Sequence, residues 1–164
     1  MPRSKNIAEV RKHLAASPSR VFGAFADASV VSRWLTPSPE VSLTILEFDF
    51  RVGGRYRFAY GVPSRGTMFV NGVYRTIEPL TTIVFSWHIE PPDEHAGLQS
   101  EVIITLSPQG PGTDLVIRHA RLTQPGAAGR HETGWLGALE QLADAVRDAH
   151  WNASEAATFE TRIE

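Results

Sequence analysis

The side chain with the clearest chemical potential in this sequence is His119, which stands in a stretch of alternating apolar residues. Leu115, Ile117 and His119 share one parity within Asp114–Leu122, so a strand there would turn all three toward the same face. An imidazole on an apolar face can orient a carbonyl group of a bound molecule or act as a base near neutral pH. It can also be a hydrogen-bonded core residue, and the sequence leaves both interpretations open. His119 is the candidate for a catalytic group.

Other patterns that support catalysis are weak. The chain has no cysteine and no Gly-x-Ser-x-Gly motif, so it offers no thiolate and no recognisable serine nucleophile. Asp93-Glu94-His95 is the one local cluster of metal-ligand types, and its place in a proline-flanked loop favours a solvated turn. We therefore expect no metal and no cofactor, and whether the protein is an enzyme stays open.

The composition is that of a globular chain of 164 residues with a formal net charge of -2. Charges of both signs are interspersed, and without a concentrated basic face we expect no nucleic acid partner. No stretch approaches the roughly 20 apolar residues of a membrane span, and the first residues lack the apolar run of a signal peptide. We expect one cytoplasmic domain over residues 1–164, with its core at about 7–147 and a tail at 148–164.

The elements that must position these groups begin with one long helix. Within His131–Val146, Trp135, Leu139, Leu142 and Val146 recur at spacings of four, three and four residues, which is one stripe of an α-helix. Almost everything before this stretch predicts strands. A sheet with one apolar face needs a cover, and only this helix is long enough to provide it.

The upstream part predicts seven strands and two short helices. Ser17 is a plausible N-cap before Pro18 at the first helical position, and a second short helix follows over Asp27–Leu35. In the second strand Leu46, Phe48, Phe50 and Val52 alternate with charged residues and are expected on one face. The predicted strands are Lys5–Ala15 at an edge, Val41–Val52, Arg55–Tyr60, Thr67–Ile77, Thr82–Ile89, Glu101–Leu106 and Asp114–Leu122.

Asn71-Gly72 conflicts with this assignment because it is a strong signal for a two-residue hairpin. A turn there would split Thr67–Ile77 into two short stubs. We favour one continuous strand, with Gly72 as a bend or a point of close approach. The resulting prediction is an α+β fold, in which a strongly bent antiparallel sheet grips one C-terminal helix and two short helices follow the first strand.

Four stretches carry a resemblance to a known family. They are Ser17–Phe25 leading to Trp34–Pro37, Phe48–Tyr56, Gly72–Pro79 running on to Phe85–Trp87, and Gly134-Trp135 at the opening of the last helix. On these the chain resembles the START-like, or helix-grip, superfamily (SRPBCC). Within it the chain resembles the branch named after the C-terminal domain of the activator of Hsp90 ATPase. The resemblance implies a helix-grip fold with a cavity between the sheet and the C-terminal helix.

The function that this resemblance implies is the binding of a small hydrophobic molecule in that cavity. Two alternatives stay open: a cyclase- or hydratase-type enzyme, with His119 as the first candidate to move a proton, and a chaperone-linked interaction module that uses an exposed surface. The first strand at the sheet edge, or the tail with Trp151 and Phe159, is the candidate for pairing two copies as a homodimer.

The residues expected to contact the ligand come from the short helices, the sheet and the last helix. In the strand Thr82–Ile89, Phe85 and Trp87 have one parity and Val84, Ser86 and His88 the other, so only one set can face the cavity. An apolar wall with a few hydroxyl and imidazole groups is typical of a small-molecule pocket, although the same side chains would equally fill a solid core. The candidates are Phe25, Trp34, Tyr56, Phe58, Met68, Val70, Phe85, Trp87, Ile117, His119, Trp135, Ala138, Leu139 and Leu142.

Overall fold

The structure is a computed structural model that describes residues 6–147, so the predicted tail with Trp151 and Phe159 lies outside the described residues. Seven strands and three helices follow one another in the predicted order. They are β1 (Ala8–Leu14), α1 (Pro18–Ala26), α2 (Ala28–Trp34), β2 (Ser42–Phe48), β3 (Arg55–Val62), β4 (Gly66–Glu78), β5 (Thr82–Ile89), β6 (Gln99–Gln109), β7 (Gly112–Ala120) and α3 (Ala127–Arg147).

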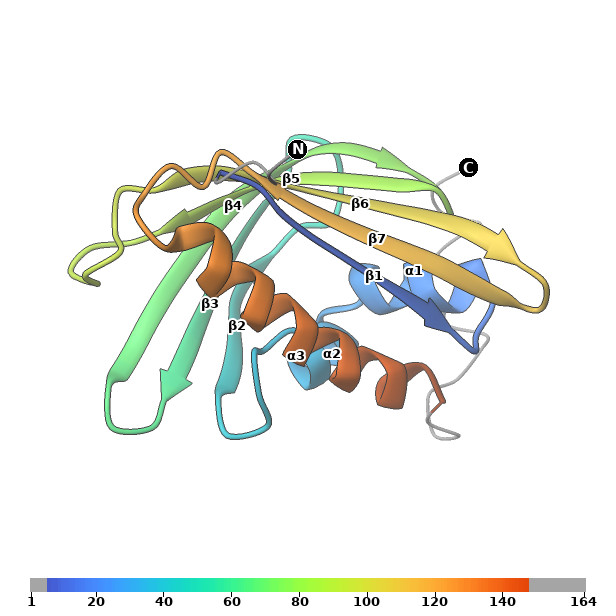
Figure 1. Cartoon of the computed structure of the whole chain (residues 1–164), viewed down its shortest axis with the longest axis horizontal. Coiled ribbons are helices and arrows are strands. Elements are labelled where there is room, and N and C mark those ends of the chain that lie inside the picture. The colour runs from blue at the N-terminus through green and yellow to red at the C-terminus, as the bar shows by residue number, and fades with distance from the viewer. Residues whose placement is uncertain (1–5, 148–164) are drawn as a thin grey trace.

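The strands form one antiparallel sheet in the order β1-β7-β6-β5-β4-β3-β2, with β1 and β2 at its edges. Figure 1 shows that the sheet is bent, with β2, β3 and β4 turning down while α3 crosses the inner face. The short helices α1 and α2 lie beside the C-terminal half of α3 (Figure 1). This arrangement confirms the predicted helix-grip fold, because the one long helix covers the apolar face of the sheet.

Both short helices begin at capping side chains, and the cap at Ser17 is the one that the sequence predicts. The Ser17 side chain accepts a hydrogen bond from the backbone N–H of Arg20 at 3.2 Å, which satisfies an amide that a helix start otherwise leaves free. Asp27 caps α2 in the same way by accepting from the N–H of Ser29 at 2.9 Å. At the end of α2 the indole N–H of Trp34 donates to the carbonyl of Ala24 at 3.0 Å, which ties the two helices together.

Strand β2 departs from the predicted alternation. The prediction that Leu46 and Val52 share the inner face with Phe48 is wrong, because these two side chains are 49% and 63% exposed. The register between β2 and β3 shifts between Ile45 and Glu47. A bulge adds one residue to a strand and so reverses which parity faces inward. Ile45 packs against the core before the bulge and Phe48 after it.

Strand β4 runs without a break through Asn71-Gly72, as we favoured. The reason lies beneath Gly72, where the hydroxyl of Tyr56 donates to the backbone carbonyl of Ser86 at 2.6 Å. A Cβ on Gly72 would lie 2.5 Å from Cε2 of the Tyr56 ring and 2.0 Å from the Ser86 carbonyl oxygen. The glycine therefore marks a close approach between strand and side chain and makes no turn. Burial raises the pKa of Tyr56 well above its usual value.

Helix α3 begins at Ala127, four residues before the predicted start, so the loop expected over Thr123–Gly129 is too long. Gly134-Trp135 consequently lies about two turns into the helix and does not open it. The early start is held by a small hydrophobic cluster that is separate from the main core, and its members are Ala8, Leu98, Leu122 and Ala127. The apolar stripe of the helix could not reveal this turn, because alanine and glycine carry little periodic signal.

Candidate ligand pocket

An apolar pocket of about 190 Å³ lies beside the N-terminal half of α3. The C-terminal ends of β3 and β5, the N-terminal end of β4 and the segment after α2 form its other walls. An engineered cavity of about 150 Å³ in another protein is large enough to hold benzene, so this space suits a molecule of one or two rings. Its lining residues are Leu35, Thr36, Pro37, Val41, Tyr60, Val62, Met68, Trp87, Ile89, His95, Arg130, His131, Gly134, Trp135 and Ala138.

Four of the predicted contact residues line this pocket. Met68 comes from β4, Trp87 from β5, and Trp135 and Ala138 from α3. The sequence left open which side chains of β5 face inward. The burial pattern of the strand answers this, because Phe85 and Trp87 are buried together with Ile83 and Ile89 of the same parity.

Five other predicted contacts surround a second void near α1 and α2, which has a volume of only about 10 Å³. Such a space holds one water at most. Here the aromatic rings pack against each other edge to face or tilted, with centroids 4.9 Å apart for Phe25 and Trp34 and 4.6 Å apart for Tyr56 and Phe58. This region is packed core. The five residues are Phe25, Trp34, Tyr56, Phe58 and Phe85.

The remaining five candidates are buried and lie outside the described lining of the pocket. They are Val70, Ile117, His119, Leu139 and Leu142. Conversely, more than half of the lining comes from positions that the candidate set lacks, and most of these lie in loops or in the first turns of α3. Pro37, His95 and His131 are examples. Alternation along strands carries no information about loop residues, so this half of the site had no periodic signal in the sequence.

His119 is the centre of a buried hydrogen-bond chain. The indole N–H of Trp135 donates to its Nδ1 at 3.0 Å, and its Nε2 lies 2.7 Å from the hydroxyl oxygen of Ser100. An indole can only donate, so Nδ1 must be the acceptor and Nε2 carries the proton. The Ser100 hydroxyl accepts this proton and donates in turn to the backbone carbonyl of Trp87 at 2.9 Å.

This chain gives His119 a structural position, because both of its ring nitrogens are occupied. Its side chain is 0% exposed. Burial, and to a lesser extent the nearby His131, lowers the pKa of His119 well below its usual value and keeps the ring neutral. The imidazole holds the pocket wall at Trp135, and a role for it as a base on a bound molecule remains a hypothesis that these contacts do not favour.

Unlike His119, His131 lines the pocket, as does His95. Its Nδ1 lies 2.8 Å from the carbonyl of Ala127, which fixes the proton on that nitrogen and leaves Nε2 as an acceptor while the ring is neutral. Its ring centroid is 4.6 Å from that of His119. Burial is the main cause that lowers the pKa of His131, so the neutral form prevails at neutral pH.

The wall opposite the sheet is formed by residues 35–41 and is fixed to α3. A Cβ on Gly137 would lie 1.9 Å from the carbonyl oxygen of Pro37, so only glycine permits this contact. The side-chain amide of Gln141 donates to both the backbone oxygen and the hydroxyl of Thr36, at 2.7 and 2.8 Å. From the sheet side, the Tyr60 hydroxyl donates to the carbonyl of Leu35 at 3.0 Å.

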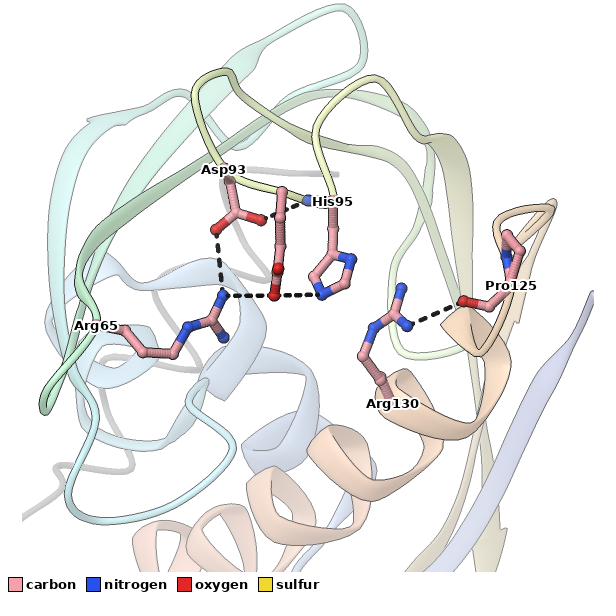
Figure 2. Close-up of polar contacts among 6 residues, drawn as sticks. Arg65, Asp93, His95, Pro125 and Arg130 are labelled. Carbon is pink, nitrogen blue, oxygen red and sulfur yellow. Dashed lines mark hydrogen bonds and ion pairs between the residues drawn. The ribbon is translucent and has the colours of Figure 1, made fainter.

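The loop between β5 and β6, residues 90–98, contributes His95 to the pocket lining, and Figure 2 shows His95 opposite Arg130 of α3. We call this end of the pocket, where Arg130 is exposed, its mouth. Arg65, in the turn between β3 and β4, reaches Asp93 at 3.8 Å and Glu94 at 3.3 Å. Asp93 also accepts from the backbone N–H of His95 at 2.8 Å, and the His95 ring lies 3.3 Å from Glu94. On the other side Gln124 donates to the carbonyl of Ala96 at 3.2 Å. The loop is therefore tied to both rims of the mouth.

Across the mouth from this cluster stands Arg130, in the first turn of α3 (Figure 2). Its guanidinium donates to the carbonyl of Pro125 at 3.0 Å. Within residues 6–147 no group of three His, Asp or Glu side chains is placed to hold a metal ion. Asp93 and Glu94 are engaged by Arg65.

A wider hollow of about 470 Å³ lies at the other end of α3, and its walls include Arg33, Pro39, Gln141, Asp144 and Arg147. Polar and charged side chains dominate these walls, which does not suit an apolar molecule. We therefore place the candidate site in the apolar pocket. Of the helices in the described part of the chain, none is long and apolar enough to cross a membrane.

A bent antiparallel sheet closed by one long C-terminal helix over an apolar pocket defines a helix-grip protein. Residues 15–147 match the profile of the family described as activator of Hsp90 ATPase homolog 1-like protein, and the chain belongs to this family. A search of curated proteins found no match.

Solved structures of similar fold cover most of this chain. Protein CV1439 from Chromobacterium violaceum is 29% identical, with a TM-score of 0.78 over 88% of this chain and 99% of that one. A protein of Silicibacter pomeroyi that is named for the same family is 21% identical, with a TM-score of 0.75 over 86% and 97%. DynU16, a protein of the dynemicin biosynthetic locus, is 20% identical, with a TM-score of 0.69 over 88% of this chain and 48% of that one.

Proposed function

We propose that this protein binds a small hydrophobic molecule in the pocket between the sheet and α3, and that residues 1–164 act as one domain. The observation that carries the proposal is the pocket of about 190 Å³ itself, whose walls include Tyr60, Met68, Trp87 and Trp135. The family's fold is a ligand-binding fold, which agrees with this use of the space. Aromatic walls with few polar groups favour flat, apolar ligands.

The size of the pocket sets the expected affinity. A bicyclic hydrocarbon such as indane matches the available volume and has no polar group to satisfy. Small ligands gain at most about 1.5 kcal/mol per non-hydrogen atom, and typical values are well below this ceiling. We therefore expect a dissociation constant on the order of 10 to 100 μM for indane.

Titration calorimetry with indane tests the proposal, with saturable binding at one site as the expected result. Ala138→Leu should abolish the heat of binding, because Ala138 is buried, lines the pocket, and a leucine there would fill the space. Leu136→Ala is the matched control on the same helix, since Leu136 is exposed and should leave binding unchanged. A folded wild-type protein that shows no saturable binding of indane or comparable bicyclic compounds would contradict the proposal.

The cyclase- or hydratase-type alternative remains open and would use the same pocket. The observation that favours it is the neutral imidazole of His131 on the pocket wall, whose Nε2 is an acceptor. A base must lie within hydrogen-bond reach of the proton it removes, and the buried His119 does not line the pocket. His131→Asn should abolish turnover of an identified substrate while leaving its binding within about twofold; unchanged turnover would exclude His131 as the base.

A further inference from the structure

His131 presents an unused hydrogen-bond acceptor at the pocket wall. Its Nδ1 donates to the Ala127 carbonyl at 2.8 Å, so in the neutral ring the other nitrogen, Nε2, is an acceptor. No residue within 6–147 donates to this nitrogen. In the same range Trp87 Nε1 is the only side-chain nitrogen or oxygen that is both fully buried and without a hydrogen bond. Nε2 of His131 therefore keeps accessible surface.

The surroundings of the ring show from which side a donor can reach Nε2. The two nitrogens of an imidazole are separated by one carbon and diverge, so Nε2 points away from the Ala127 carbonyl. His119 packs against the ring at a centroid distance of 4.6 Å, and both of its nitrogens are in use. The pocket borders the same ring. A donor for Nε2 is thus best supplied by a molecule in the pocket.

Hydroxyl groups of the pocket wall are already engaged. The Thr36 hydroxyl accepts from the Gln141 amide at 2.8 Å, and the Tyr60 hydroxyl donates to the Leu35 carbonyl at 3.0 Å. Thr36 and Tyr60 are also only 5% and 3% exposed. Neither hydroxyl competes with His131 for a polar group on a bound molecule.

His95 is the second imidazole of the lining, and it lies at the mouth (Figure 2). Its Nε2 is 3.3 Å from Glu94, whose side chain is 70% exposed, so water reaches this pair. His131 instead lies against the fully buried His119. A hydrogen bond is stronger where water is excluded, so the acceptor of His131 discriminates more sharply between ligands.

The environment of His131 keeps its ring neutral at neutral pH. Burial is the main cause that lowers its pKa, and the positive charges of Arg130 and His95 lower it further, against the opposing hydrogen bond to Ala127. No carboxylate of the described residues is among the groups that shift this pKa. Nε2 thus stays an acceptor, which favours a donor on the ligand.

We propose that the pocket selects an apolar ring compound that carries a hydroxyl group, and that this hydroxyl donates to Nε2 of His131. The inference rests on the proposed function and narrows its ligand to phenols and alcohols of one or two rings. A ketone or an ether of the same size would turn a lone pair toward the lone pair of Nε2 and gain nothing there. His131 is then the residue that determines this specificity.

Probes built on one scaffold test the proposal by calorimetry at neutral pH: indane, fluoroindane and the two phenolic indanols, with the hydroxyl next to the ring fusion or one carbon farther. At least one indanol should bind about fivefold more tightly than indane, which is the gain of one neutral hydrogen bond. Fluoroindane is close to indanol in size but has no donor, so it should show no such gain. An equal gain for fluoroindane would overturn the proposal.

His131→Phe keeps a ring in the wall but has no acceptor. The ratio of indanol to indane affinity should therefore fall from about five to about one or below. Taking the ratio within each variant cancels changes in pocket shape that affect both probes. His13→Phe is the control, because His13 is an exposed histidine of β1 outside the pocket lining, and it should keep the fivefold ratio. A ratio that survives in His131→Phe would overturn the contact.

Nitrogen NMR of the wild-type histidines gives an answer even if His131→Phe does not fold. An unprotonated imidazole nitrogen that accepts a hydrogen bond moves upfield, so saturation with indanol should move Nε2 of His131 upfield relative to indane. No such difference, or a difference confined to His95, would contradict the hydrogen bond. Equal affinities of indane and both indanols would overturn this inference alone. Absence of binding by all four probes would overturn the proposed function with it.

Discussion

The indole N–H of Trp135 donates to Nδ1 of His119 over 3.0 Å, which joins a wall of the pocket to a fully buried imidazole. His119 in turn reaches Ser100 through its other nitrogen. Helix α3 and strands β6 and β7 are thereby linked by side chains as well as by apolar packing. The sequence suggests His119 as a candidate catalytic group. In the structure His119 instead holds the Trp135 side chain in the pocket wall.

His119→Ala should therefore lower the free energy of unfolding by about 3 kcal/mol. The change leaves a cavity, and it removes the acceptor of Trp135 and the donor to Ser100. Urea denaturation followed by circular dichroism measures the loss. His13→Ala is the control, because His13 is exposed on β1 and its partner is Asp114, so its loss should cost under about 1 kcal/mol. Equal effects of the two substitutions would contradict a structural role for His119.

The stability of the protein should fall as the pH drops below about 6.5. The pKa values of His119 and His131 are lowered in the folded protein, in both cases mainly by burial. Between the folded and the unfolded pKa the unfolded chain binds protons that the native state does not, so stability rises with pH in that window. The contribution is complete above the unfolded value and is lost as the pH falls.

His131→Asn tests this pH dependence. The asparagine amide can still donate to the Ala127 carbonyl, as Nδ1 of His131 does, but it does not titrate. Each histidine contributes a slope of at most about 1.4 kcal/mol per pH unit, so the variant should lose part of the dependence below about pH 6.5. Urea midpoints measured across this range provide the readout. A slope that is unchanged in the variant would show that His131 does not contribute.

The fold was predictable from the sequence because its helices and strands differ in hydrophobic periodicity and are separated by clear turn and cap residues. The cap at Ser17 and the stripe through Leu139 each depend on local interactions, and both are present in the structure. The errors lie where the period is interrupted. A bulge after Ile45 exchanges the two faces of β2, and the alanine- and glycine-rich start of α3 has no stripe to detect.

The candidate site was predictable from the sequence only in part, for a geometric reason. Alternation identifies which strand residues face inward, but it does not tell whether helix or empty space lies opposite. Val70 and Met68 share a parity on β4, yet Val70 is fully buried in the core and Met68 lines the pocket. His131 and Arg130 stand at a helix start, where no sequence pattern indicates that a mouth lies beside them.

Gly137→Ala should destabilise the protein although alanine is the better helix former. Exchanging a mid-helix glycine for alanine normally gains about 0.5 to 1 kcal/mol. At Gly137 the new Cβ would meet the Pro37 carbonyl oxygen at 1.9 Å and push residues 35–41 away from α3. The hydrogen bonds from Gln141 to Thr36 would then be lost, and we expect a net loss of about 2 kcal/mol in urea denaturation.

Gly129→Ala is the matched control on the same helix. Apart from its chain neighbours and the backbone of its own helix, nothing lies within 4 Å of a Cβ built on Gly129. The helix preference therefore acts alone, and stability should rise by a few tenths of a kcal/mol up to about 1. A gain in stability from both substitutions would mean that residues 35–41 can move away from α3 without loss of free energy. They would then also fail to hold the shape of the pocket.

Arg65→Ala should loosen the mouth of the pocket while leaving global stability almost unchanged. The ion pairs of Arg65 with Asp93 and Glu94 are solvent-exposed on the arginine side, and such pairs contribute under about 1 kcal/mol. Their effect is local, because they join the β3–β4 turn to the loop 90–98 that covers the mouth. Amide hydrogen exchange within that loop should accelerate several-fold, and bound indane should dissociate faster. Arg51→Ala removes a comparable surface pair, with Asp49, and should change neither rate. Unaltered exchange in Arg65→Ala would show that the loop is held by its own turns and by Gln124.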